Sequence, residues 1–174
     1  MIQKNIRLIA LVLLLVSSIA FAGSGLPICS DGKREIPVIN TDVIQWKATT
    51  PNQYRARAHV RGTVTRMFPD RNGHTHFEIQ MDAKTSGAAG LLEVVYNDEF
   101  GKLPVIEEKA DIESCGVYIT SNAPTERYPA SPSGAIIHWI HINPSKRGEP
   151  DGYLAIQGKV YGDQLPPKQK PPKR

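Results

Sequence analysis

The sequence lacks a complete catalytic signature. Three candidate nucleophiles, Ser131, Ser133 and Ser145, lie in Pro-rich or charged segments without the Gly-x-Ser-x-Gly pattern that presents a serine on a sharp turn. Asp70 and Asp151 flank segments rich in turn residues, where aspartate is favoured for backbone reasons. We therefore predict no catalytic residue from these patterns, and the sequence favours a non-enzymatic role while leaving enzymatic activity open.

Long apolar runs are also missing, except for one near the start of the chain. Residues 8–16 are all apolar, Lys4 and Arg7 precede them, and residues 20–22 read Ala-Phe-Ala, a pattern that signal peptidase accepts. This run is shorter than the roughly 20 residues that a bilayer span needs. We therefore predict a signal peptide over residues 1–22, a secreted or periplasmic protein, and a mature chain without a membrane span.

Cysteine is scarce, since Cys29 and Cys115 are the only two in 174 residues. An even number of cysteines in a protein bound for an oxidising compartment favours a disulfide. Two unpaired thiols are the alternative, but free thiols are uncommon in exported proteins. We predict a disulfide between Cys29 and Cys115, which would tie the N-terminal segment to the middle of the domain.

Excess basic charge is confined to the two ends of the chain. The net charge is +4, but 2 of the 21 Lys and Arg precede residue 23 and 4 follow Gln164, whereas all 17 Asp and Glu lie between, which leaves this central part at −2. The basic pI is thus weak support for nucleic-acid binding by the folded body. Residues 165–174 are rich in Pro, Lys and Gln, and we expect them to form a disordered basic tail.

Alternation of apolar and polar residues predicts strands through most of the central part. Residues 53–66 and 74–82 alternate on either side of an Asn-Gly turn within residues 69–73. Gly62 and Gly116 interrupt two predicted strands and indicate bulges or bends. Further strands are expected over residues 91–96, 110–120 and 135–142, with a terminal hairpin over residues 153–161.

These segments predict one mainly β domain over residues 53–164. Five or six strands with glycine-marked bends indicate a small antiparallel barrel that is OB-like (oligonucleotide/oligosaccharide-binding), and a β-sandwich is the alternative. Residues 23–52 are expected to form an N-terminal arm, with a short helix between Asn40 and Pro51.

One face of the first predicted strand is cationic. Its outward positions hold side chains that carry or can carry positive charge: Arg55, Arg57, His59 and Arg61. Pairing with Glu78 and Asp82 of the next strand is one expected role for this face. The other is a surface that binds an anionic ligand such as phosphate, nucleic acid or an acidic glycan.

The second predicted strand carries a pair of histidines. The i, i+2 spacing places His74 and His76 on one face with Glu78 beyond them, a set that suits zinc if a third ligand comes from elsewhere, such as His59 or His141. Ordinary solvent-facing histidines explain the spacing equally well. We therefore predict no required cofactor and keep zinc, held by His74, His76 and His141, as an alternative.

Residues 136–152 join an apolar run to two histidines and a tryptophan. Strand alternation places His138 and His141 on opposite faces, so they could share a metal only across a bulge. We expect His138 to lie among isoleucines as a neutral, hydrogen-bonded core residue, because buried polar groups normally find partners. Trp139 is expected to serve in packing more than in ligand binding.

Several of these motifs resemble a known family. They are Gly-Thr-Val-Thr-Arg-Met-Phe-Pro-Asp at residues 62–70, Gly73-His74 followed by Phe77, Ile-His-Trp-Ile-His at residues 137–141, Asn143-Pro144, and Gly152-Tyr153-Leu154. In order and spacing they are similar to the bacterial domain of unknown function (DUF) 3465 family, whose most specific motif is His-Trp-x-His.

That resemblance implies an exported or envelope-associated OB-like barrel of no established activity. Its marked positions would be His74, His138, Trp139 and His141. Ile142 stands where the family usually has a further histidine, and Gly148 stands near another. The resemblance therefore implies a binding or structural role ahead of a metal or acid/base role.

The sequence as a whole predicts a non-catalytic module that binds an anionic nucleic acid, glycan or envelope component. The residues expected to contact the ligand are Arg55, Arg57, Arg61, His74, Trp139 and His141. One alternative is a metal-dependent hydrolase or nuclease that uses the surface histidines His74, His76 and His141. Another is a structural envelope protein that docks through its basic tail.

Overall fold

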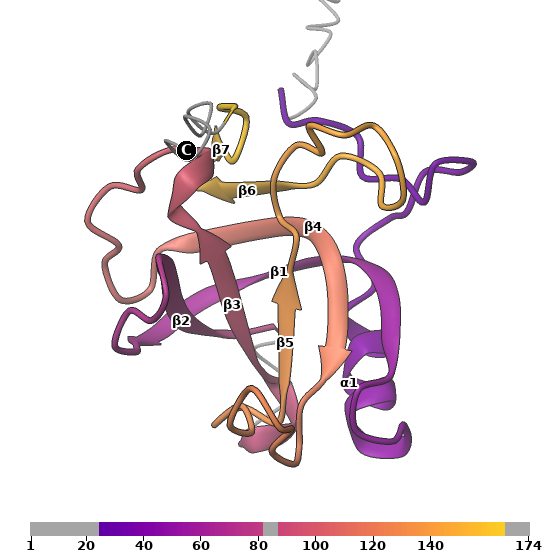
Figure 1. Ribbon diagram of the computed structural model, residues 1–174. Helices are drawn as coiled ribbons and strands as arrows, with labels where there is room; N and C mark the ends of the chain where they lie inside the picture. The colour runs from indigo at the N-terminus through magenta and orange to yellow at the C-terminus, as the bar shows by residue number, and fades with distance from the viewer. Residues whose placement is uncertain (1–24, 82–86, 166–174) are drawn as a thin grey trace, which may run out of the picture.

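The computed structural model describes residues 25–81 and 87–165 (Figure 1). The predicted signal peptide lies outside these residues, as does the predicted tail beyond Leu165. The elements in chain order are α1 (Asn40–Thr49), β1 (Arg55–Met67), β2 (His74–Gln80), the 3-10 helix η1 (Ala88–Gly90), β3 (Leu91–Asn97), the 3-10 helix η2 (Asp98–Phe100), β4 (Asp111–Thr120), β5 (Ala135–His138), β6 (Tyr153–Ile156) and β7 (Lys159–Tyr161). No helix in the described ranges is long and apolar enough to cross a membrane.

The strands form one sheet that closes on itself. Their order is β1-β2-β3-β5-β4-β6-β7, and an additional pairing of β1 with β4 closes the first five into a barrel. The predicted small OB-like barrel is confirmed. It differs from the all-antiparallel expectation because β3 and β5 run parallel. A closed ring with an odd number of strands cannot alternate in direction at every pair, so one parallel pair is unavoidable.

The long strand β1 pairs with both β4 and β2, and it bends to do so. Its first nine residues pair with β4, and the register against β2 shifts between Val64 and Arg66. A Cβ atom on Gly62 would lie only 2.4 Å from the carbonyl oxygen of Gln80, so this glycine lets the strands approach closely at the bend. The prediction of a bend near Gly62 is confirmed.

The turn between β1 and β2 has the predicted geometry. Asn72 and Gly73 both have left-handed backbone angles, with φ of 52° and 71°. This is the two-residue turn whose twist matches that of antiparallel strands, and Asn-Gly is its preferred sequence. The turn sets the inward face of β2, where Phe77 and Ile79 are fully buried.

Helix α1 covers one end of the barrel. Val43 is fully buried in the core, and the Trp46 ring packs on Tyr118 with a centroid distance of 5.5 Å. Asn40, the first residue of the helix, bridges to the barrel: its amide oxygen accepts a hydrogen bond from the Arg61 backbone N–H, and its amide nitrogen donates to the Met81 carbonyl oxygen. The helix is therefore held by tertiary contacts and not by a side-chain cap.

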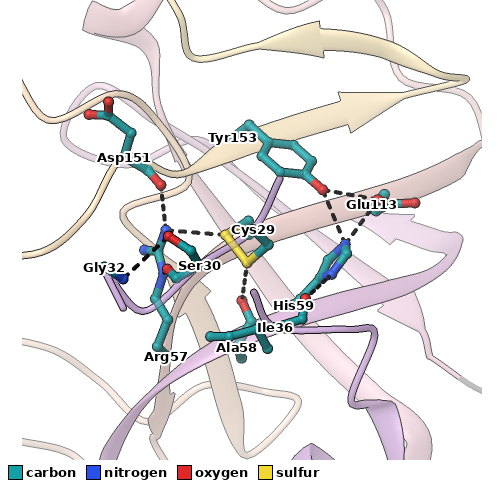
Figure 2. The surroundings of a disulfide bond; sticks show 11 residues. Cys29, Ser30, Gly32, Ile36, Arg57, Ala58, His59, Glu113, Asp151 and Tyr153 are labelled. Carbon is teal, nitrogen blue, oxygen red and sulfur yellow. Dashed lines mark hydrogen bonds and ion pairs between the residues drawn. A yellow bond between two sulfur atoms is a disulfide. The ribbon is translucent and has the colours of Figure 1, made fainter. Parts of the chain in front are cut away.

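The N-terminal arm is fastened to the barrel by the predicted disulfide (Figure 2). Cys29 and Cys115 are bonded across a sequence separation of 86, and both are buried. Beside the bond, the Arg57 guanidinium donates hydrogen bonds to the carbonyl oxygens of Ser30 and Asp151. The disulfide prediction is confirmed, and a buried disulfide is compatible with an extracellular or periplasmic protein.

A buried carboxylate makes the second link between arm and barrel. The His59 ring lies between the Ile36 carbonyl oxygen (2.9 Å from Nδ1) and Glu113 Oε1 (2.9 Å from Nε2), and the Tyr153 hydroxyl donates to the same carboxylate (Figure 2). Burial alone would raise the pKa of Glu113, but hydrogen bonds from Arg61, His59 and Tyr153 outweigh it and lower that pKa. Part of the predicted cationic face thus serves in cross-strand pairing, with Glu113 of β4 and not with β2.

Candidate ligand-binding cleft

A cleft of about 330 Å³ opens on the outer face of the barrel. Its floor comes from β2, β3, β5 and the end of β4, and it lies between the β1–β2 turn and residues 121–134, which join β4 to β5. Ligand sites in OB-type barrels use the same face of the second and third strands and the same two loops. The volume is near the lower end of the roughly 300–1,000 Å³ typical of small-molecule sites.

The two histidines of β2 line the cleft side by side. Their ring centroids are 6.4 Å apart. His74 Nδ1 is 3.0 Å from the carbonyl oxygen of Asn72, and His76 Nδ1 is 2.7 Å from Glu93 Oε1. Because both partners are acceptors, each Nδ1 carries the proton of that hydrogen bond. Within the described structure Nε2 is the nitrogen of each ring that has no hydrogen-bond partner. Because both rings line the same cleft, the predicted placement of His74 and His76 on one face is confirmed.

Two buried carboxylates connect the cleft to residues 121–134. Glu78 and Glu93 are each 3% exposed, although sequence alternation placed Glu78 on the outer face. Ser133 Oγ donates a hydrogen bond to Glu78 at 2.7 Å, and Ser131 Oγ donates to Glu93. Residues 121–134 therefore cover this part of the outer face, and their two serine hydroxyls are hydrogen-bonded to both buried carboxylates. The importance of Glu93 was missed, and its only sequence signal is a lone carboxylate within the apolar strand Leu-Leu-Glu-Val-Val-Tyr.

His138 is not the hydrogen-bonded core residue that alternation predicted. Ile137 and Ile140 are fully buried, whereas His138 lies in the cleft wall with its ring centroid 5.3 Å from that of His74. Its Nε2 is buried and has no hydrogen-bond partner in the described structure. The prediction was wrong because β5 pairs with β3 and β4 in the register that turns Ile137 into the barrel.

The environment of His138 keeps its ring neutral. The pKa of His138 is lowered from 6.5 to about 3, chiefly by burial and to a smaller extent by the positive charge of His74, His141, His76 and Arg55. The expectation of a neutral imidazole therefore agrees with its environment, although the residue lies on the other side of the strand.

Trp139 and Arg55 meet at the edge of the cleft. Trp139 has a left-handed φ of 51°, which ends β5 after His138 and shortens the strand predicted to reach residue 142. Its ring lies 4.6 Å from that of His138, and the Arg55 guanidinium carbon lies 5.7 Å from the Trp139 ring centroid. Both residues were expected to contact a ligand, and the structure brings them together in the cleft wall.

The other three residues expected to contact a ligand do not line the cleft. Arg57 lies against the disulfide, and Arg61 pairs with Glu113. The His141 ring stacks on Phe100 with a centroid distance of 3.5 Å, and burial lowers its pKa. In the described parts of the chain no three His, Cys, Asp or Glu side chains are grouped so that they could hold a metal ion.

Two further arginines line the cleft and were missed by sequence reasoning. Arg71 belongs to the β1–β2 turn and Arg127 to the segment between β4 and β5. Both are exposed loop residues with no periodicity to mark them. With Arg55 they place three guanidinium groups around a cleft that has one carboxylate, Glu93, among its described lining residues. The cleft is therefore suited to an anion.

Acidification from pH 7 to pH 5 is expected to cost about 2 kcal/mol of unfolding free energy through His138 alone, at about 1.4 kcal/mol per pH unit below the unfolded pKa. The folded pKa is about 3 against 6.5 in the unfolded chain, so below pH 6.5 the unfolded chain takes up a proton that the folded chain does not. Urea unfolding of wild type and His138→Gln at both pH values measures the difference. If both lose the same stability, His138 is not the cause.

Fold and cleft together define an OB-like barrel with a cationic cleft on the face of its second and third strands. Comparisons of the chain with protein-family models, with curated proteins and with solved structures gave no match. The resemblance to the DUF 3465 family therefore stays a prediction.

Proposed function

We propose that this protein is an exported binding module that takes an anionic ligand in the cleft. The observation that carries the proposal is the charge of the cleft wall, whose described lining holds three arginines, Arg55, Arg71 and Arg127, and one carboxylate. That carboxylate, Glu93, offsets one of the three guanidinium charges, and its oxygens are hydrogen-bonded to His76 and Ser131, so the lining keeps an excess of positive charge for a ligand. Arginine suits phosphate and carboxylate because its planar donors match two oxygens at once.

Export is supported by two separate features. The signal-peptide pattern of residues 1–22 directs the chain out of the cytoplasm, and the buried disulfide between Cys29 and Cys115 suits an oxidising space. We accordingly place the protein in the periplasm or outside the cell.

Among anionic ligands, the cleft favours single-stranded nucleic acid over an acidic glycan. Trp139 and the exposed Tyr128 border the cleft together with its arginines. Aromatic rings beside a cationic groove are the usual means of binding single strands without sequence preference. A glycan or an envelope component stays an alternative ligand, and a metal-dependent hydrolase or a structural envelope protein stays an alternative function.

Fluorescence anisotropy with a labelled single-stranded oligonucleotide tests the proposal. Wild type is expected to bind at low salt and to weaken as salt rises, because bound phosphates release counterions. The double variant Arg71→Ala, Arg127→Ala should reduce the slope of log affinity against log salt by about 2, since each lost phosphate contact lowers it by about 1.

Arg34→Ala is the matched control for this experiment. Arg34 is exposed in the N-terminal arm, pairs only with Asp31 among the described residues, and does not line the cleft. It should bind like wild type. Absence of binding by wild type at low salt, or equal weakening by Arg34→Ala, would overturn the nucleic-acid version of the proposal, and an acidic polysaccharide in the same assay then tests the glycan version.

A further inference from the structure

Two imidazoles in the cleft are held by different kinds of partner. His74 donates from Nδ1 to a neutral backbone carbonyl, that of Asn72, whereas His76 donates to the carboxylate of Glu93. A backbone carbonyl fixes a neutral ring with the Nε2 lone pair free, which is the form of a proton acceptor. A carboxylate against Nδ1 fixes the tautomer and orientation of a ring whose Nε2 transfers a proton to or from a reacting group.

We infer that the cleft cleaves single-stranded RNA, with His74 as general base and His76 as general acid. The inference rests on the proposed function for capture of the strand, and it goes beyond that function by assigning a reaction. The two ring centroids are 6.4 Å apart and both rings line the cleft, so the two imidazoles are close enough to contact one bound phosphodiester. Proton transfers by such a pair on opposite sides of a phosphorus atom are what an in-line displacement needs.

The reaction is an internal displacement at phosphorus. His74 Nε2 takes the proton of the ribose 2′-hydroxyl, and the 2′-oxygen forms a new bond to phosphorus. The bond from phosphorus to the 5′-oxygen of the next nucleotide breaks, and His76 gives its Nε2 proton to that oxygen. The products are a 2′,3′-cyclic phosphate and a free 5′-hydroxyl, and the two imidazoles have exchanged protonation states, which exchange with water restores.

RNA is the substrate class because the nucleophile then comes with the substrate. Ser131 carries a hydroxyl of the cleft lining that contacts the partner of His76, and its Oγ–H is donated to Glu93 and not to an imidazole. Deprotonation of Ser131 by His76 would require that hydrogen bond to be broken and the His76–Glu93 contact to be rebuilt. A ribose 2′-hydroxyl needs only to meet the free Nε2 of His74.

Four other residues of the cleft lining have roles in this reaction. Arg71 and Arg127 face the non-bridging oxygens, where negative charge develops during the displacement. Glu93 is a positioning residue, since it holds His76 and is itself held by Ser131. His138 is a neutral neighbour of His74, so it adds no positive charge beside the general base.

The test uses a DNA oligonucleotide with one internal ribonucleotide, labelled by a fluorophore and a quencher, with the purified protein in EDTA. Wild type is expected to cleave at the ribonucleotide and to leave a 2′,3′-cyclic phosphate, detected by mass spectrometry. His74→Ala and His76→Ala should each lower the rate at least about 100-fold, the lower bound for loss of a general acid or base. Arg34→Ala is the matched control and should retain the rate, because Arg34 is exposed in the N-terminal arm and does not line the cleft.

Thermal melts establish that each variant is folded, and a 2′-O-methyl strand of the same sequence reports binding without cleavage. If folded wild type binds this strand but leaves the ribonucleotide intact, the reaction is refuted and the binding proposal stands. If it binds neither strand, both proposals fail for nucleic acid. Cleavage that persists in His74→Ala and His76→Ala, or that also occurs in the all-DNA strand, refutes the assignment of these two residues.

Discussion

Replacing Cys29 and Cys115 together by alanine is expected to lower the free energy of unfolding by about 4.5 kcal/mol, the chain-entropy value for closing a loop of this length. The bond spans a sequence separation of 86, so its main effect is to restrict the unfolded chain. The fold of a single small domain is stable by only about 5–15 kcal/mol, so the variant should be close to unfolding.

Urea unfolding of wild type, of reduced wild type and of the double variant measures this loss. Reduced wild type and the double variant should lose similar amounts, and a reductant should have no effect on the variant. The N-terminal arm should also become accessible to proteases, because its backbone hydrogen bond between Ile36 and Cys29 and its packing near Tyr153 depend on the fastened arm. A loss of less than about 1 kcal/mol would contradict the entropic account.

Gly152→Ala is expected to destabilise the fold by about 3 kcal/mol, at the upper end of overpacking effects. A Cβ atom at this position would lie 2.3 Å from the carbonyl oxygen of Trp139 and 2.5 Å from that of Cys115. Both neighbours are backbone atoms. Trp139 directly follows β5 and Cys115 lies in the middle of β4, so neither carbonyl oxygen can move without displacing a strand.

The same substitution should also disturb the cleft. Gly152 donates its backbone N–H to the His141 carbonyl oxygen, and displacement of this segment would shift Trp139 at the cleft edge. Gly25→Ala is the matched control, because Gly25 has no atom within 4 Å of its would-be Cβ. Urea unfolding and oligonucleotide anisotropy on both variants give the comparison. Equal stability of the two variants would show that β4 and β5 can separate locally at little cost.

Elements defined by neighbouring residues were predictable from the sequence. The Asn72-Gly73 turn follows from the positive φ that both residues tolerate, and the buried face of β2 follows from alternation. The terminal hairpin was also predicted, and it turns at Gln157-Gly158, again with two positive φ values. These features depend on interactions within a few residues, which a linear sequence displays directly.

Features that depend on which strands meet were not predictable in the same way. The face on which His138 lies depends on the register of β5 between β3 and β4, and both faces of that segment carry apolar residues, so alternation could not decide it. In the sequence Glu93 is an isolated acid. Its contact with Ser131 depends on residues 121–134, which lie over it only in the folded protein. Arg71 and Arg127 are loop residues whose neighbourhood depends on barrel closure.

The sequence by itself determined the approximate positions of the strands, the turn between β1 and β2, the disulfide pairing and the presence of a β-barrel, because apolar periodicity, turn residues and two cysteines are local or countable properties. Only the tertiary structure decided which side chains share the cleft. Closure of five strands brings β2 beside β3 and β3 beside β5, and so places His74, His76, Glu93 and His138 in one wall. Their proximity arises from strand pairing between segments about 20 to 60 residues apart, which no short pattern encodes.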